Sequence, residues 1–99
     1  MNPQPSPSTC FVVGEGGIPA RCLELLRRYG FRVLGVFSDD GSLRDVCAQA
    51  DVPHFASRDA LAAALRQTAY DYLFSINNEW VLPADVVATA GRLALNYTV

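Results

Sequence analysis

The sequence predicts a single α/β domain built on an open, doubly wound and mainly parallel sheet of five strands. Two observations carry this prediction. Short runs rich in Val and aromatic residues alternate with Ala- and Leu-rich stretches of helical periodicity along the 99 residues, which requires parallel strands with helical crossovers. The composition, 51% hydrophobic and 18% charged, is that of an ordinary folded chain with one core.

The first strand is expected at residues 10–13, a short apolar run. Residues 14–17, with the sequence Gly-Glu-Gly-Gly, end this run in a tight turn. A helix follows, because Pro19 suits a first helical turn and apolar side chains then recur at helical spacing. Gly30 ends this helix.

The second strand is expected at residues 31–37, a continuous apolar run typical of a central strand that is covered on both faces. A polar loop, residues 38–41, ends it. Ser42 is expected to cap a second helix that continues to about Ala50, with apolar residues on its inner face.

A short third strand is expected at residues 52–55, where Pro53 indicates a place at or near the edge of the sheet. Ser57 then caps a third helix that continues to about Thr68. Its Ala- and Leu-rich face is expected to point into the core.

The fourth strand is expected at residues 70–76, and a loop at residues 77–83 follows it. A short helix at residues 84–90 ends at Gly91. Residues 93–97 form the fifth predicted strand. Residues 10–99 thus make one domain.

The charge distribution excludes one large class of partner. All eight basic residues are Arg, they are spread along the chain, and the formal net charge is -2. Nucleic-acid-binding proteins concentrate positive charge on one face, so no nucleic-acid partner is expected.

The beginning of the chain indicates neither secretion nor a membrane anchor. Residues 1–9 are rich in Pro and Ser and lack the charge and apolar stretch of a signal peptide, so they are expected to form a flexible lead-in. No later apolar run approaches the roughly 18 residues that span a membrane. We therefore expect a cytoplasmic protein without a membrane partner.

The thiols and the imidazole do not form a metal-binding pattern. Cys10, Cys22 and Cys47 are odd in number and isolated, which fits neither a disulfide framework nor a Cys-x-x-Cys site. We expect buried structural thiols and no metal. His54, the only histidine, has no second ligand or nucleophile beside it and is assigned to packing or to the surface.

Ligands of doubly wound sheets bind beyond the carboxyl ends of the strands. Four segments lie at that edge, namely residues 14–17, 38–41, 77–82 and 96–99. The carboxylates of Asp39, Asp40 and Asp45 suit exposed loop and helix-start positions, so no catalytic role is assigned to them.

The glycine turn is a candidate phosphate or anion loop. The backbone N–H groups of Gly14, Gly16 and Gly17 are free to approach an anion at a helix start. A dinucleotide fingerprint needs a third glycine where Pro19 stands. A small anion site, a dinucleotide site and a purely structural turn are the interpretations left open.

The loop at residues 77–82 is the second candidate site. The side-chain amides of Asn77 and Asn78 suit the edge of a heterocycle, and Trp80 offers a stacking face. Val81 and Leu82 add an apolar wall. The alternative is a simple entrance to the next helix, with Trp80 packed beneath it.

The order of these segments resembles the amino-terminal part of methionyl-tRNA formyltransferases and of formyltransferase domains that begin some nonribosomal peptide synthetases. The resemblance covers roughly residues 10–98. Its carriers are the opening strand and glycine turn, Gly-Phe-Arg-Val-Leu-Gly-Val-Phe at 30–37, Val-Pro-His-Phe at 52–55, Asp-Tyr-Leu-Phe-Ser-Ile at 71–76, Val-Leu-Pro at 81–83 and Leu-Asn-Tyr at 95–97. The sequence Phe-Ser-Ile in this segment is closer to the peptide-synthetase branch. The resemblance implies a Rossmann-like sheet, the amino-terminal half of such a domain.

The resemblance also implies a chemistry. In that family a formyl group passes from 10-formyltetrahydrofolate to an amine, and an Asn, a His and an Asp stabilise the oxyanion and move protons. The Asn falls on Asn96, whereas the position of the His holds Thr98. The chain ends at Val99, before the family's Leu-Pro loop and catalytic Asp. Losing one oxyanion donor typically costs about 3 kcal/mol, so independent formyl transfer is not expected and folate affinity should be weak.

The sequence therefore predicts a truncated or degenerate formyltransferase-like domain, related to folate-dependent N-formylation in peptide natural-product biosynthesis. The alternative is a noncatalytic docking module whose partner is a peptide synthetase or the remainder of the domain. A small anion-binding regulatory domain is a third interpretation, which rests on the glycine turn alone. The fifth strand would be an exposed edge, and we expect homo-oligomers through residues 93–97.

Overall fold

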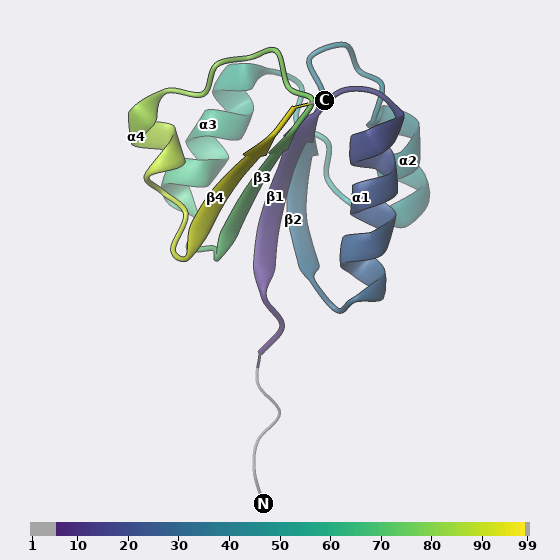
Figure 1. Ribbon diagram of the computed structural model, residues 1–99, viewed down its shortest axis with the longest axis horizontal. Helices are drawn as coiled ribbons and strands as arrows, with labels where there is room; N and C mark the ends of the chain where they lie inside the picture. Colours follow the sequence, from purple (N-terminus) through teal and green to yellow (C-terminus); the bar gives the residue numbers. More distant parts are fainter. Residues whose placement is uncertain (1–5, 99) are drawn as a thin grey trace, which may run out of the picture.

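The structure, a computed structural model, describes residues 6–98, which form an α/β domain around a four-stranded parallel sheet. The strand order is β2-β1-β3-β4 (Figure 1). In chain order the elements are β1 (Thr9–Gly14), α1 (Gly17–Arg28), β2 (Arg32–Phe37), α2 (Arg44–Ala50), α3 (Arg58–Gln67), β3 (Tyr72–Ile76), α4 (Ala84–Val87) and β4 (Leu93–Tyr97). The Rossmann-like α/β class and the parallel pairing are confirmed. Most of the predicted lead-in, residues 1–5, lies outside the described residues.

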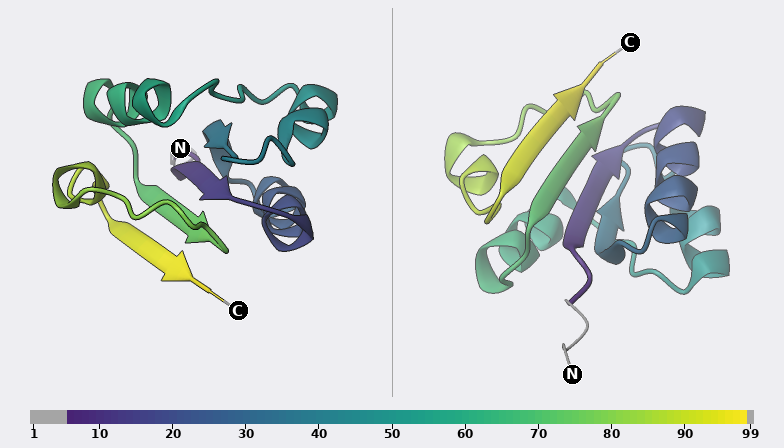
Figure 2. Two further views of the ribbon diagram at one scale, coloured as in Figure 1. Left: turned by 90° about the horizontal axis from the view of Figure 1, so that it is seen from above. Right: turned by 60° about the horizontal axis from the view of Figure 1, so that its bottom comes forward.

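The helices cover both faces of the sheet, as a doubly wound fold requires. Seen from above, α1 and α2 lie on one side of the sheet, and α3 and α4 lie on the other (Figure 2). The core accordingly forms two clusters. One joins the sheet to α3 and α4, and the second joins it to α1 and α2.

β1 lies in the middle of the sheet and connects the two clusters. Phe11 and Val13 belong to the cluster beneath α3 and α4, whereas Cys10 and Val12 belong to the cluster beneath α1 and α2. Successive side chains of a strand point to opposite faces, so a strand that is covered on both faces needs an unbroken apolar run. This is why residues 10–13 do not alternate with polar residues.

The predicted strand at residues 52–55 is wrong, and the five-stranded sheet with it. The described residues contain only an isolated parallel bridge there, between His54 and Val36 of β2. Its hydrogen bonds join Val36 N to Pro53 O and Phe55 N to Val36 O, each at 2.9 Å. Pro53 has no N–H with which to extend a ladder, and the chain turns into α3 soon afterwards.

Of the two predicted serine caps, one is confirmed. The Ser57 hydroxyl caps α3 by accepting a hydrogen bond from Ala60 N at 3.0 Å. The cap predicted at Ser42 is wrong, because Leu43 precedes the first turn of α2 and no side chain caps it. The Ser42 hydroxyl instead accepts a hydrogen bond from Gly16 N at 2.9 Å, and fully buried Leu43 anchors the turn.

The three cysteines are free thiols. Cys10 and Cys47 are buried as predicted, and burial raises the pKa of the Cys10 thiol to about 12. Cys22 is only half-buried, because α1 turns it toward a shallow apolar hollow. Within residues 6–98, no group of three His, Cys, Asp or Glu side chains could hold a metal ion. In the same part of the chain, no helix is long and apolar enough to cross a membrane.

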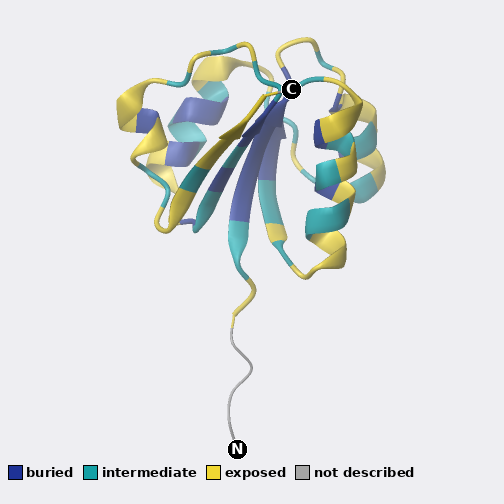
Figure 3. Cartoon of the chain, in the orientation of Figure 1, coloured by how far each residue is buried: buried dark blue, intermediate teal, exposed yellow. Residues whose placement is uncertain are grey.

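Coverage of the sheet falls off toward β4. Figure 3 shows exposed residues along this strand, whereas β1 beside β3 is largely buried. Leu93, Leu95 and Tyr97 keep 51%, 49% and 52% of their surface exposed. The β4 side is therefore the part of the sheet where apolar surface meets solvent.

Candidate functional site

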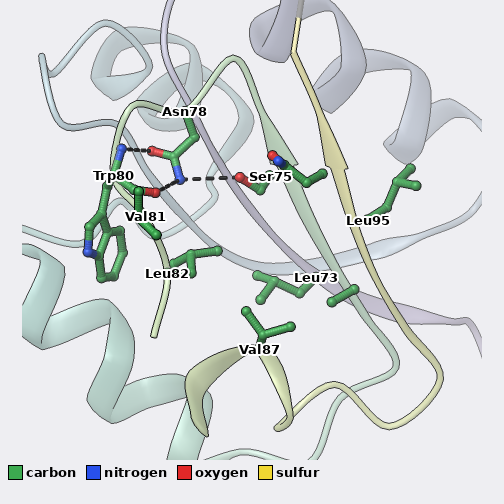
Figure 4. A pocket seen from close by; sticks show the side chains of 10 residues that line it. Leu73, Ser75, Asn78, Trp80, Val81, Leu82, Val87 and Leu95 are labelled. Atoms are coloured by element: carbon green, nitrogen blue, oxygen red, sulfur yellow. Dashed lines mark hydrogen bonds between the residues drawn. The ribbon is translucent and has the colours of Figure 1, made fainter. Parts of the chain in front are cut away.

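A cavity of about 260 Å³ opens between β3, β4, the loop that follows β3, and α4 (Figure 4). It is mostly apolar, with polar groups at a few positions. Its walls are formed by Leu73, Ser75, Asn78, Trp80, Val81, Leu82, Val87, Ala94, Leu95 and Asn96. It lies toward the carboxyl ends of β3 and β4, where ligands of doubly wound sheets bind.

The register between β3 and β4 builds the floor of the cavity. Leu73 pairs with Ala94, and Ser75 pairs with Asn96. Directly paired residues point to the same face of a sheet, so these four side chains stand together on the face that carries α3 and α4. Asn96 is exposed, whereas Ser75 is buried to 5% exposure. The floor thus has a polar end at Ser75 and Asn96 and an apolar end at Leu73 and Ala94.

The amide of Asn78 shapes the loop above this floor. Its Oδ1 accepts a hydrogen bond from Trp80 N at 3.1 Å, and its Nδ2 donates to Trp80 O at 2.8 Å and to Ser75 Oγ at 3.2 Å. Figure 4 shows these bonds closing the turn. Asn78 therefore holds the loop against β3, and its amide is already engaged within the protein.

Trp80 is held from two sides by other parts of the chain. Its ring meets Phe37 edge to face, with 6.0 Å between ring centroids. The guanidinium carbon of Arg58 lies 5.5 Å from the ring centroid, and Arg58 Nε donates to Asp39 Oδ1 at 2.9 Å. A cation over an aromatic ring is attracted by the electron-rich face of that ring. The indole is therefore fixed in place while still lining the cavity.

α4 closes the cavity on the side away from the sheet. It ends at Val87, earlier than the predicted 84–90, and the Thr89 hydroxyl donates to Val86 O at 2.6 Å. The hydroxyls of Thr89 and Tyr70 also form a hydrogen bond, which ties this turn to the chain before β3. Gly91 N then donates to Tyr70 O at 2.9 Å. These bonds bring Val87 over the floor of the cavity.

Chemically, the cavity is suited to binding rather than to proton transfer. None of the ten described residues that line it has an acidic, basic, thiol or phenol side chain. General acid–base catalysis needs a group whose pKa lies near the working pH. An amide at Asn96 can donate and accept hydrogen bonds, and a hydroxyl at Ser75 can do the same.

The structure brings together most of the residues that the sequence assigned to a ligand. Asn78, Trp80, Val81, Leu82 and Asn96 line one cavity. Asn77 is not in its lining. Its backbone has φ 50°, and its N–H donates to Tyr97 O at 2.8 Å, which joins the ends of β3 and β4. Thr98 is exposed and also lies outside the lining.

Five lining residues were not predicted from the sequence, namely Leu73, Ser75, Val87, Ala94 and Leu95. Those on the floor follow from one signal. Given the pairing of residue 75 with residue 96, alternation along each strand places residues 73 and 94 beside them on the same face. Val87 had no comparable signal, because its position over the floor depends on how α4 packs against the sheet.

The glycine turn lies at the same edge, among carboxylates. Burial raises the pKa of the Glu15 carboxyl, and the negative charges of Asp40, Glu79 and Asp39 raise it further. Gly16 N already donates to Ser42 Oγ. These negative charges weaken the attraction of Gly14, Gly16 and Gly17 for an anion, while the positive charge of Arg58 acts in the opposite direction.

His54 has a structural role and is not part of the cavity lining. Its Nε2 lies 2.7 Å from Ser38 Oγ and accepts a hydrogen bond from Ser38 N at 3.1 Å. Ser38 Oγ in turn accepts from Leu43 N at 3.1 Å. Burial, and the positive charge of Arg44, lower the pKa of His54. A neutral imidazole therefore pins residues 52–55 to the end of β2.

Comparison with solved structures shows a likeness in fold. No protein-family model matches the sequence, and no protein of curated function matches it. A formyltetrahydrofolate deformylase from Pseudomonas putida KT2440 is similar in structure, with a TM-score of 0.66 and 15% sequence identity. The match covers 95% of this chain and 39% of that protein, so the chain spans well under half of its length. The likeness shows the fold alone, a Rossmann-like α/β domain similar to the aligned part of that deformylase.

Proposed function

We propose that this chain is a formyltransferase-like module that binds the ring end of a tetrahydrofolate derivative and performs no formyl transfer of its own. The proposal rests on one observation: the cavity is lined by Asn78, Trp80, Val81, Leu82 and Asn96. The residue types of the loop suggested a heterocycle, and the sequence resemblance separately assigned Asn96 to the formyl group. The likeness in fold to a formyltetrahydrofolate deformylase is consistent with a ligand of this class.

The cavity fits one ring system in size and in chemistry. Its volume of about 260 Å³ is just below the range of about 300–1,000 Å³ that is usual for whole small-molecule sites. Leu82 and Val87 offer apolar contacts to the faces of a ring, and Asn96 and Ser75 offer hydrogen bonds to its edge. Because only part of a folate is enclosed, we expect weak affinity.

The same residues argue against independent turnover. When bound, 10-formyltetrahydrofolate supplies an activated formyl group. The side-chain amide of Asn96 can donate a hydrogen bond to a carbonyl oxygen, but no described lining residue can take up a proton near neutral pH. His54 forms its bridge on the outer side of β2, whereas Asn96 lies on β4 at the other end of the sheet. With about 4.8 Å between neighbouring strands, this puts the two residues roughly 19 Å apart across the sheet. The chain can therefore orient a ligand without moving its protons.

Binding is tested by titrating a redox-stable tetrahydrofolate analogue while recording the fluorescence of Trp80, the only tryptophan in the sequence. We expect a saturable change in emission, because Trp80 lines the cavity. Ala94→Phe places a ring inside the cavity, and we expect it to weaken binding at least about tenfold, or about 1.4 kcal/mol.

Leu93→Phe is the matched control, because Leu93 lies on the same strand but points to the opposite face. This variant should bind like the original chain. Titration with p-aminobenzoylglutamate, which lacks the pterin ring, corrects for absorption by the ligand. If the folded chain shows no saturable response up to millimolar analogue, or if Ala94→Phe binds as tightly as Leu93→Phe, the proposed site is wrong.

A noncatalytic docking module is the second candidate function. The half-exposed apolar side chains of Leu93, Leu95 and Tyr97 favour it, because a strand edge with such residues is suited to pairing with another chain. A peptide synthetase as the partner, and with it N-formylation in peptide natural-product biosynthesis, rests on the sequence resemblance alone.

A further inference from the structure

The outer edge of β4 is an open strand edge with an apolar face. Among residues 6–98, β4 pairs only with β3. Leu93, Leu95 and Tyr97 project from it to the face that carries α1 and are about half exposed. Beside Leu95, an apolar hollow lined by Leu25, Leu26 and Phe74 extends the same surface.

The hydrogen bonds to β3 show which backbone groups of β4 remain open. Leu93 N donates to Asp71 O at 3.2 Å, and Tyr97 O accepts from Asn77 N at 2.8 Å. In a parallel pair, alternate residues direct both their N–H and C=O groups to the same neighbour. Leu93, Leu95 and Tyr97 therefore face β3, and the N–H and C=O groups of Ala94 and Asn96 face outward.

We propose that two copies of the chain pair antiparallel through β4, about a two-fold axis at Leu95. Ala94 then stands opposite the partner's Asn96, and their outward N–H and C=O groups form a hydrogen-bonded pair on each side of the axis. The two sheets join into one continuous sheet of eight strands. This inference does not depend on the ligand of the cavity.

The side chains match in this register. Leu95 faces the partner's Leu95, and Leu93 faces the partner's Tyr97 on both sides of the axis. These are non-hydrogen-bonded pairs, whose side chains approach most closely in an antiparallel sheet. Aliphatic and aromatic side chains that are half exposed in one copy would thus cover each other.

A second copy suits this edge because nothing on the strand opposes self-pairing. Residues 93–98 contain no charged residue and no proline, which are the usual protections of an exposed edge. Arg92, the nearest charge, would stand opposite the partner's Thr98, so no like charges meet. Centring the pair on Leu95 is the register that pairs all five residues of β4.

The pairing also borders the ligand cavity. Ala94 and Asn96 line the cavity on the opposite face of β4. The partner's Asn96 would stand beside Ala94, on the outer flank of the cavity. Three apolar side chains per copy make a smaller interface than the roughly 1,200–2,000 Å² of a stable complex, so we expect a reversible dimer.

The test is sedimentation of the 99-residue chain across low to high micromolar concentration, with variants at the axis. The original chain should shift reversibly from monomer to dimer. Leu95→Lys and Leu95→Glu should each remain monomeric, because each places like charges directly opposite one another. Mixing these two variants should restore dimers, since opposite charges then meet at the axis.

Ile18→Lys, at an exposed apolar position on α1, is the control and should dimerise like the original chain. Circular dichroism establishes that each variant is folded. A strictly monomeric original chain overturns the proposal, as does self-association that survives Leu95→Lys. Failure of the mixed Leu95 variants to pair contradicts the register, even if each single variant is monomeric.

Discussion

Gly14 ends β1 at a point where no side chain fits. A Cβ atom on Gly14 would overlap the main-chain oxygen of Ile76 on β3 and would lie 3.0 Å from Pro19 Cβ. Gly17, three residues later, has open space where its Cβ would be. Within one turn, Gly14 therefore allows two strands to approach closely, whereas Gly17 is not sterically required.

We predict that Gly14→Ala lowers the free energy of unfolding by about 1–3 kcal/mol, because the backbone of β3 must shift to accommodate a methyl group. Gly17→Ala should stay within about 0.5 kcal/mol of the original chain, since it meets no neighbour at the start of α1. Urea unfolding of the two variants measures both values. Equal losses would show that the turn does not depend on this contact.

At the scale of single residues, the sequence indicated which side chains gather but not all of what they do. Asn78 was assigned to a ligand because amides suit heterocycles, yet its amide closes the loop through Trp80 and Ser75. The partner of an amide depends on the local path of the backbone, which residue type does not specify. Trp80 lines the cavity, and contacts with Phe37 and Arg58 hold its ring.

Among the elements, the segment at residues 52–55 depends most on a single contact. His54 Nε2 accepts a hydrogen bond from Ser38 N, which requires that nitrogen to be unprotonated. Burial and the charge of Arg44 lower the pKa of His54 from 6.5. The unfolded chain therefore takes up this proton at a higher pH than the folded chain does.

It follows that the contribution of His54 to stability is present above about pH 6.5 and is lost as the pH falls through its lower folded pKa. We predict that lowering the pH from about 7.5 to about 5.5 reduces the free energy of unfolding of the original chain more than that of His54→Gln. Urea unfolding at both values measures this difference.

Glu15 is present in both the original chain and the His54→Gln variant. The effect of its raised pKa on stability is therefore the same in both and cancels in the difference. Asp39 and Asp40 have lowered pKa values and contribute at more acidic pH. If the two chains lose stability in parallel, protonation of His54 does not control this contact.

The elements that the sequence predicted well are those that local pattern decides. The Ser57 cap and the strand at residues 93–97 are found as expected, because their signals lie within a few neighbouring residues. The Ser42 cap and the strand at residues 52–55 were wrong for a shared reason. Each depended on a part of the chain distant in sequence. The Ser42 hydroxyl bonds Gly16 N instead of capping α2, and residues 52–55 form only one bridge to β2 instead of a continuous ladder.

Across the whole molecule, the class and winding of the sheet followed from the alternation of strands and helices. The cavity did not, because it exists only once the register sets Ser75 against Asn96 and α4 lies above them. Two separate segments of the chain, at positions 75–82 and 94–96, share one site for this reason. Register over such a distance is set by packing, which a single sequence does not display.

One measurement distinguishes a ligand site beside β4 from a site at the glycine turn. Backbone amide signals of the chain are followed by NMR while a redox-stable tetrahydrofolate analogue is added. We expect saturable shifts concentrated at residues 78–82 and 94–96, with little change at residues 14–17. Shifts concentrated at residues 14–17 and 38–41, or no saturable shifts at millimolar ligand, would contradict it.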